Sequence, residues 1–547
     1  MNQSSSIRGI RTSWNLRSRY VIRALRVAAC AVAALLAAPT TVAAEPHVLR
    51  FADALDITTI DPLDPRVAAN AQLDYLTAAY LVRYSSRGLV PEYATVVPSR
   101  QNGGISRDGR TIVFHLRRDA RWSDGAALTS ADVAFTLAYL RDPKTITQFR
   151  DGTQFFDRVE TPDARTVTFR LKRPFLSALD FFGSRNAPLV PEHILAKGDP
   201  RAFAALPIGA GPFRYVRWSR GDRVVLERNP YYALGKAKLR RIEYVMDQSI
   251  TSAVTGMRTG RIDLMPTQSN ATYRQIQGVD GITARAEPAV RATLIAFNTR
   301  DVSLSEQAVR RALRSALDRT GLLRRVFSGA GSLAETPIPT DDPFAASLPI
   351  EPYDPQRARA ILDAAGWKVG PDGFRARGGR RLAVTLVAPS GAIAGDETVE
   401  LVRANWTAVG VEVTTKRYPA SFLFAPASQG GVLEGGSFGA AFFGLGELRA
   451  RDLDLYLPCR LAPPNGANYF RFCDARVDRL LARASSAYEE SKTRSSFFGV
   501  QRIVTDAVPF IVVARLDQYD IARDSVVGAV RGSLAYFFDP LTIDVAR

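Results

Sequence analysis

Residues that could perform catalysis are few in this 547-residue chain. Residues 435–439 read Gly-Gly-Ser-Phe-Gly, which matches the G-x-S-x-G pattern of a serine nucleophile. That pattern needs a histidine later in the chain, but the chain's histidines are His47, His115 and His193. A secreted hydrolase acting through Ser437 is therefore an alternative that lacks its base. A glycosidase is not excluded, although no spacing singles out a carboxylate pair.

Metal and nucleotide chemistry find equally little support. None of the three histidines has the spacing of a metal-ligand set. Gly209 and Gly211 are followed by Pro212, which has no backbone donor, so they do not form a phosphate-binding turn. We therefore expect no metal and no cofactor.

The N-terminus reads as an export signal. Six arginines and no acid lie within residues 8–26, followed by a short apolar run at 27–38 and small residues at 41–44. The apolar run is too short to span a bilayer permanently. We predict a signal peptide at about 1–44 and a mature protein in the periplasm.

The three cysteines fit this compartment. Cys459 and Cys473 are 14 residues apart, and an oxidising environment favours a disulfide between them. Such a bond contributes roughly 3 kcal/mol. Cys30 leaves with the signal; residues 27–30 superficially resemble a lipoprotein box, but there the apolar run follows the cysteine instead of preceding it.

Net charge is +18, and loss of the six signal arginines leaves +12. The basic residues are spread along the chain and mixed with acids, and no nucleic-acid-binding motif accompanies them. We therefore expect a solvated, distributed charge and no nucleic-acid partner.

A β-rich module should occupy the first half of the chain. Residues 111–118 and 166–173 both read T-x-x-F-x-L-[RK]-R, which predicts two strands of one small sheet with His115 facing solvent. Between them, Thr129 and Asp132 form a capping box that begins a helix, and Leu128 and Val133 a hydrophobic staple. This stretch is therefore predicted to be scaffold.

The rest of the chain alternates between strands and helices, which indicates α/β lobes. Helices are predicted at 68–84 and 251–258, from the cap Ser305, from the cap Asp354 to Gly366, and at 397–409. Strands are predicted at 48–52, 214–218, 223–228, 240–245, 263–265, 294–298, 382–387 and 411–415.

The ordered set of segments resembles one family, the peptide/nickel-type extracellular solute-binding proteins (family 5), which are receptors of ABC importers. The resemblance covers essentially the whole mature chain. Its segments are GLVPEYA (88–94), WSDG (122–125), LTSADV (128–133), KRPF (172–175), VPEHIL (190–195), GAGPF (209–213), NPYY (229–232), FNT (297–299), VRRAL (309–313), YDP (353–355), AAGW (364–367), NY (468–469) with Cys473, and VDRLL (477–481).

The resemblance implies a two-lobe periplasmic binding protein-like α/β fold with a third, β-rich subdomain inserted in lobe I. Ligand would lie between the lobes, which close over it. The expected parts are a signal peptide (1–44), lobe I (45–90, 205–297 and 505–547), the inserted subdomain (91–204) and lobe II (298–504).

The resemblance also implies a set of ligand-binding residues. The position resembling the family's aspartate, which pairs with a peptide's free amine, is Leu445, and its aromatic before Ser-Phe-Leu resembles Pro419. Both departures argue against a plain dipeptide or oligopeptide. Glu447 could supply the missing charge or could be a solvated loop acid. The expected ligand-binding residues are Ala52, Asp53, Ala54, Tyr418, Phe443, Gly444 and Glu447.

The expected function is the periplasmic substrate-binding component of an ABC transporter that imports peptides or a peptide-like solute. Its partners would be that solute and the permease subunits. It would contact the membrane only through the permease. We expect a monomer without enzymatic activity. The alternatives are the secreted hydrolase and a binding protein of the same fold used for signalling or chaperoning.

Overall fold

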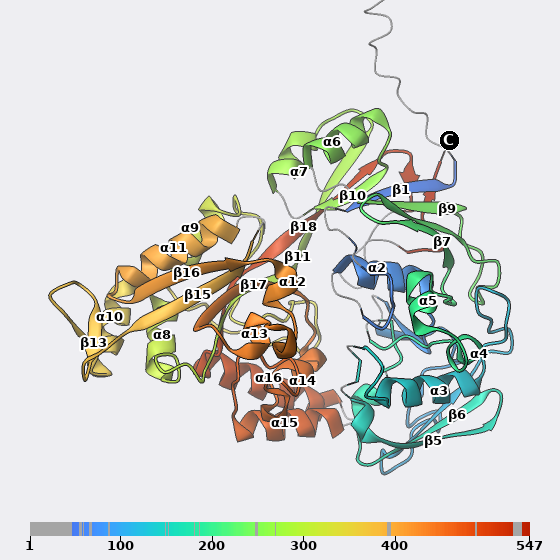
Figure 1. The fold of residues 1–547 in the computed structure, drawn as a ribbon, viewed down its shortest axis with the longest axis horizontal. Helices are drawn as coiled ribbons and strands as arrows, with labels where there is room; N and C mark the ends of the chain where they lie inside the picture. The colour runs from blue at the N-terminus through green and yellow to red at the C-terminus, as the bar shows by residue number, and fades with distance from the viewer. Residues whose placement is uncertain are drawn as a thin grey trace, which may run out of the picture.

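Long strands shared by two halves of the molecule organise the fold (Figure 1). The predicted signal segment and Ala54 lie outside the residues that the structure describes. This computed structural model describes residues 46–53, 57, 59–64, 68–85, 88–147, 149–150, 152–179, 181–184, 186–246, 250–267, 270–390, 395–486, 490–528 and 539–546.

Within the described residues, a ten-stranded mixed sheet runs through both lobes. Its strand order is β16 (Glu412–Tyr418), β15 (Ala383–Pro389), β17 (Ala440–Glu447), β11 (Ile282–Phe297), β18 (Phe510–Arg523), β10 (Leu264–Thr267), β1 (Val48–Asp53), β9 (Arg241–Met246), β8 (Arg223–Arg228) and β7 (Phe213–Ser219). The antiparallel pair β11 and β18 spans the junction, since β11 pairs with β17 of lobe II and β18 pairs with β10 of lobe I. The two-lobe α/β fold is therefore confirmed.

Lobe I packs helices against the β1 side of the sheet. Leu49, Phe51 and Tyr244 are buried there, and β1 runs parallel to β9 and β10. The remaining elements of this lobe are α2 (Ala68–Thr77), β2 (Val82–Ser85), β3 (Gly88–Pro91), α6 (Ile250–Thr259), α7 (Asn270–Ile276), β19 (Val526–Val527) and β20 (Asp544–Val545).

The helix predicted over 68–84 is wrong in its second half. It ends at Thr77, and Val82–Ser85 pairs with β3 instead. The backbone N–H of Leu81 donates to the carbonyl of Phe182 at 2.9 Å. The backbone N–H and C=O groups after Thr77 therefore bond to distant segments of the chain instead of forming another helical turn.

The inserted subdomain is built around the two predicted strands. β4 (Thr111–His115) pairs antiparallel with β6 (Thr166–Leu171), with Thr111 opposite Arg170, and His115 is exposed as predicted. The sheet order is β4-β6-β5. The other elements are β5 (Phe156–Asp163), α3 (Ser130–Arg141), α4 (Glu192–Leu195), α5 (Pro200–Ala205), η1 (Thr153–Phe155) and η2 (Leu176–Ala178).

The capping box of α3 is confirmed. The backbone N–H of Thr129 donates to Asp132 Oδ2 at 2.7 Å, and both staple residues, Leu128 and Val133, are fully buried. Asp132 also accepts from the N–H of Glu192 at 3.0 Å, which ties α3 to α4. The stretch is scaffold.

The Gly209–Gly211 segment joins the insert to lobe I through close backbone contacts. A Cβ on Gly209 would lie 1.9 Å from the carbonyl oxygen of Thr77, and one on Gly211 would lie 2.5 Å from that of Leu76. Glycine is therefore required at both positions because α2 ends against this segment.

Lobe II surrounds the other half of the sheet. Asp354 caps its helix as predicted, accepting from the N–H of Arg357 at 2.8 Å. The cap predicted at Ser305 is wrong by one residue, because Glu306 occupies the N-cap of α8. The helices are α8 (Gln307–Ser315), α9 (Arg319–Arg325), α10 (Pro355–Ala364), α11 (Gly395–Thr407), α12 (Ala420–Leu423), α13 (Val432–Gly435), α14 (Leu453–Tyr456), α15 (Ala475–Ser486) and α16 (Glu490–Ala507).

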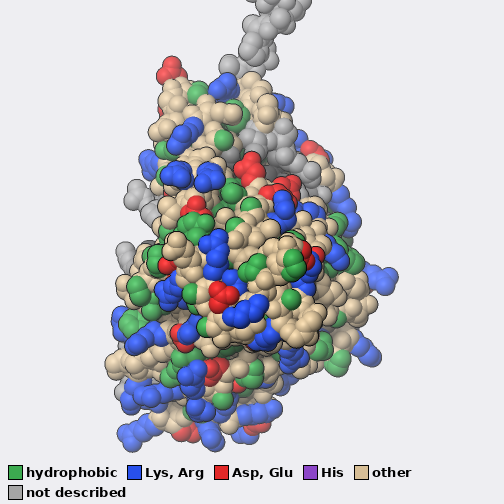
Figure 2. All heavy atoms as spheres, turned by 90° about the vertical axis from the view of Figure 1, so that its left-hand side faces the viewer, with side chains coloured by type: hydrophobic (Ala, Val, Ile, Leu, Met, Phe, Trp, Pro, Cys, Tyr) green, Lys and Arg blue, Asp and Glu red, His purple; other side chains and the backbone are tan. Residues whose placement is uncertain are grey.

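Shorter elements complete lobe II, namely β12 (Lys368–Val369), β13 (Arg375–Arg377), β14 (Arg380–Arg381), η3 (Ala427–Gln429), η4 (Ala450–Asp452) and η5 (Cys459–Leu461). Figure 2 shows basic side chains spread over one face of this lobe, with acidic and hydrophobic side chains between them. None of the described helices is both long enough and apolar enough to cross a membrane.

Candidate ligand-binding site

On the lobe I side, the candidate residues end strand β1. Ala52 and Asp53 pair in parallel with Val245 and Met246 of β9. The Ala52 side chain is 1% exposed and packs in a hydrophobic cluster with Met257 of α6. Ala52 could therefore reach a ligand only through its backbone, and its role stays a prediction, as does that of Asp53.

On the lobe II side, Phe443, Gly444 and Glu447 lie on β17, and Tyr418 ends β16. Phe443 is buried, whereas Gly444 is exposed, and a Cβ built on Gly444 would meet no atom within 4 Å. Directly opposite on β11, Thr293 is half-buried, and its hydroxyl donates to the carbonyl of Ala514 at 3.1 Å. Open space therefore borders the strand at Gly444.

The second half of β17 is paired on one side. Residues 440–447 pair with β11, but β15 reaches only Ala440 and Ala441, opposite Leu386 and Val387. Beyond Ala441, no ladder partner on the β15 side is found among the described residues. An edge that lacks a ladder partner among the described residues can offer its backbone N–H and C=O groups to an extended chain.

Aromatic side chains flank this edge. The Tyr418 ring lies 5.8 Å from that of Phe422, and the Phe424 ring meets Phe443 edge-on at 5.6 Å. Phe422 and Phe424 are each 41% exposed. Phe422 lies in α12 and Phe424 directly follows it, and Figure 1 shows α12 on the side of lobe II nearest to α2.

Sequence reasoning missed Phe422 and Phe424. The available signal was the clustering of Tyr418, Phe422 and Phe424 within seven residues, beginning at the last residue of strand β16. Two large rings that stay exposed beside a buried one provide an apolar surface for a ligand.

The two departures from the family pattern have structural roles. Leu445 is half-buried against the lobe II core, and Pro419 occupies the N-cap of α12. Glu447 lies opposite Arg291 in the β11–β17 ladder. Its assignment as a charge partner for ligand stays a prediction.

A family model described as "Bacterial extracellular solute-binding proteins, family 5 Middle" matches residues 89–456, well over half of the chain. The chain belongs to family 5 of the bacterial extracellular solute-binding proteins. This family consists of the solute receptors of ABC importers and not of enzymes.

Individual relatives are distant but nearly full-length. Protein XP55 of Streptomyces lividans is 29% identical over 453 residues, which cover 81% of this chain and 79% of XP55. The glutathione-binding protein GsiB of Pectobacterium atrosepticum is 25% identical over 89% of this chain and 92% of its own. The fold matches the oligopeptide-binding protein AppA of Bacillus subtilis, solved with a nonapeptide, with a TM-score of 0.80 at 19% identity over 91% and 99% of the two chains.

In this family 5 protein, Ser437 does not lie on a nucleophile elbow. It follows the short helix α13 and precedes strand β17, whereas the elbow places its serine between a strand and a following helix. The match to G-x-S-x-G is therefore accidental.

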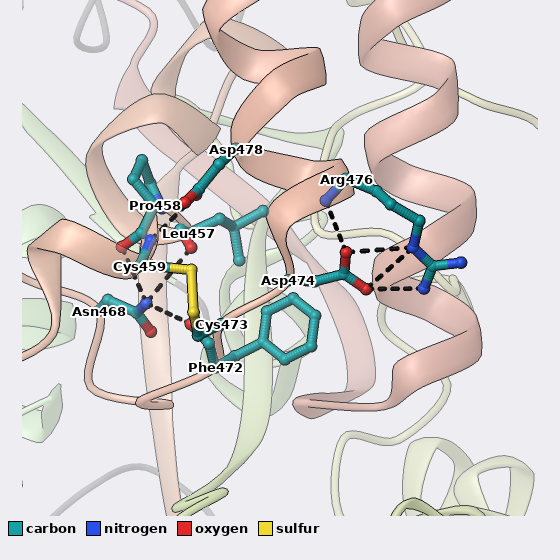
Figure 3. The surroundings of a disulfide bond; sticks show 9 residues. All are labelled: Leu457, Pro458, Cys459, Asn468, Phe472, Cys473, Asp474, Arg476 and Asp478. Atoms are coloured by element: carbon teal, nitrogen blue, oxygen red, sulfur yellow. Dashed lines mark hydrogen bonds and ion pairs between the residues drawn. A yellow bond between two sulfur atoms is a disulfide. The ribbon is translucent and has the colours of Figure 1, made fainter.

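The family 5 protein also contains the predicted disulfide, since Cys459 and Cys473 are bonded. Figure 3 shows the bond beside Asn468, a fully buried residue whose Nδ2 donates to the carbonyls of Pro458 (3.1 Å) and Phe472 (2.8 Å). The N–H of Cys459 donates to Asp478 of α15 at 3.0 Å. The loop at 459–473 is therefore held from both sides.

Proposed function

We propose that this protein is the periplasmic receptor of an importer for peptides or peptide-like solutes and that it holds its ligand between the lobes without altering it. The observation that carries the proposal is the edge of β17 next to Gly444, for which the described residues contain no ladder partner on the β15 side. An extended peptide can add to such an edge through main-chain hydrogen bonds, which are independent of ligand sequence.

The side chains beside this edge favour a ligand with apolar parts. Phe422 and Phe424 offer exposed ring faces, and Leu445 stands where a carboxylate would pair with a free amine. We therefore propose a ligand recognised by its amide backbone and apolar groups more than by an N-terminal charge. The names of GsiB and AppA, with glutathione and a nonapeptide as ligands, support a peptide-like solute.

Location and partners follow from the same proposal. The basic and apolar N-terminal segment would direct export and be removed near residue 44. The loaded, closed form would then dock on the permease subunits. The boundaries at residues 90, 204, 297 and 504 remain our assignment of the two lobes and the insert.

Calorimetric titration against peptides, opines and sugars tests the proposal, with Gly444→Leu as the decisive variant. Because Gly444 has open space beside it and its φ is not positive, leucine should fold normally and fill the ligand's position. We expect a melting temperature close to that of the wild type. The dissociation constant should be at least 100-fold higher, because the leucine side chain would clash with the bound chain.

Thr414→Leu is the matched control, since Thr414 is an exposed position of β16 in the same sheet. It should bind as the wild type does. The proposal would be refuted if the wild-type protein formed no stable complex with any library member and instead converted one of them into product.

A further inference from the structure

The disulfide loop, defined as residues 459–473, belongs to lobe II and contacts the inserted subdomain, which lies in the other half of the molecule. The guanidinium carbon of Arg460 lies 5.4 Å from the centre of the Phe155 ring. Asn465 of the same loop lines a cavity of about 450 Å³ together with residues of the insert. Behind the loop, α15 lies against η2 of the insert.

The insert side of this contact is rigid. The Phe155 ring packs on Phe175 at 4.5 Å, and the guanidinium carbon of Arg173 lies 4.3 Å from the Phe155 ring centre. The next residue, Phe156, is fully buried and packs edge-on against Phe169 at 5.1 Å. Phe155 is thus fixed by the core of the subdomain while part of its ring stays available.

The loop side is rigid as well. The Cys459–Cys473 bond closes the loop at its base, and Asn468 fills its centre. The N–H of Asn465 donates to the carbonyl of Ala462 at 3.1 Å, which fixes the turn that presents Asn465 to the cavity. Arg460 is exposed right beside the disulfide.

We infer that the disulfide loop and the Phe155 surface form a closure contact, which holds the two lobes together at the end of the molecule away from the crossing strands. β11 and β18 join the lobes at one end, whereas α15, which lies behind the loop, and β5 of the insert lie at the other (Figure 1). The contact of Arg460 with Phe155 belongs to this second end. The β-rich insert is then the surface on which lobe II docks, and the disulfide keeps Arg460 in position for it.

The size of the effect follows from the chemistry of the contact. An arginine over an aromatic ring at an exposed site changes an equilibrium by about two- to five-fold. The inference rests on the proposed function, because closure serves to retain a ligand. It is nevertheless testable without any ligand, because the contact is a property of the chain alone.

Small-angle X-ray scattering of the oxidised protein, with no solute added, provides the test. Arg460→Ala should shift the closed-to-open ratio by about two- to five-fold and enlarge the radius of gyration. Phe155→Leu removes the ring from the opposite side and should enlarge it similarly. The double variant should add little to either single change, because both remove one interaction.

Arg494→Ala is the matched control, because the Arg494 guanidinium lies 5.9 Å from the Phe344 ring entirely within lobe II. Its radius of gyration should equal that of the wild type. Unchanged scattering for both Arg460→Ala and Phe155→Leu would overturn the inference. The two proposals can fail separately. If the variants change the scattering but calorimetry finds no peptide ligand for the wild type, the closure contact is supported and the proposed function is refuted.

Discussion

Asp74 of α2 is a buried carboxylate for which the described residues provide no ion pair. Its side chain is 6% exposed. Burial raises the pKa of Asp74 well above its usual value, and the nearby charge of Asp61 raises the pKa further. At neutral pH the folded protein therefore either keeps a proton on Asp74 or pays the cost of a buried charge.

We predict that Asp74→Asn stabilises the protein in a pH-dependent way. Since the folded-state pKa is raised, the native state binds the proton more tightly, and wild-type stability falls as pH rises from the unfolded-state pKa through the folded one. The asparagine variant lacks this loss. Its free energy of unfolding in urea should exceed that of the wild type at pH 8 and match it near pH 4.

Asp108 is the control for this prediction, because hydrogen bonds from Ser106 and the backbone lower its pKa and it is fully exposed. Asp108→Asn should change stability little and in the opposite direction. An Asp74→Asn variant that is less stable than the wild type at pH 8 would show that the carboxylate has a stabilising partner.

At the residue scale, the sequence predicted the site only in part. Gly444 was selected through the family resemblance, and the open space beside it agrees with a ligand-binding role. Phe422 and Phe424 were missed, because exposure depends on how α12 packs and no local pattern reports it. Whether Ala52 presents its backbone or its side chain likewise depends on α6, some two hundred residues later.

At the scale of elements, the sequence predicted helix starts reliably where a side chain accepts a hydrogen bond from a backbone N–H group. Thr129 with Asp132 and Asp354 with Arg357 both begin helices where predicted. Length was predicted poorly. β11 extends back to Ile282, although only its last residues form an apolar run, because β18 pairs with residues 282–287 as well as with residues 291–296. Such pairing between distant segments has no local signature.

The two caps should differ in their contribution to stability. Asp132 accepts from the N–H groups of both Thr129 and Glu192 and is almost fully buried, whereas Asp354 accepts from Arg357 at a more exposed site. Asp354→Ala should cost about 1 kcal/mol, the usual value of a cap. Asp132→Ala should cost about 2–4 kcal/mol, because it leaves two partly buried donors unsatisfied.

Urea unfolding of both variants, followed by circular dichroism, measures the difference. Thr129→Ser keeps the N–H donor to Asp132 and should be close to the wild type. Equal costs for Asp132→Ala and Asp354→Ala would mean that the link from Asp132 to Glu192 contributes nothing.

At the scale of the whole molecule, one continuous sheet joins the two lobes, and the insert adds a separate sheet, β4-β6-β5. The insert has its own core around Trp122 and Phe169, separate from the cores of lobe II around Trp406 and of lobe I around Tyr244. The alternation of α and β segments predicted the lobes, but it did not predict the pairing of β11 with β18 that joins them. Sequence periodicity does not specify which distant strands become neighbours.

Because the cores are separate, loss of the disulfide should destabilise the region around it and not the insert. In the loop-entropy model, a bond closing a 14-residue separation stabilises by roughly 3 kcal/mol. Its loop is anchored to α15 through Cys459 and Asp478, whereas the insert's sheet contains no part of it. The Cys459→Ser/Cys473→Ser variant should therefore lose amide-exchange protection in α15 and in the loop, while β4 and β6 keep theirs.

Hydrogen–deuterium exchange with peptide-level resolution can distinguish this outcome from global destabilisation. Because exchange through local opening depends on the free energy of that opening, a loss of roughly 3 kcal/mol should accelerate exchange in α15 by about 100-fold. Dithiothreitol added to the wild type should reproduce the pattern. Uniform acceleration that includes β4 and β6 would mean that lobe II and the insert unfold as one unit, and the closure contact would then bear on stability as well as on ligand capture.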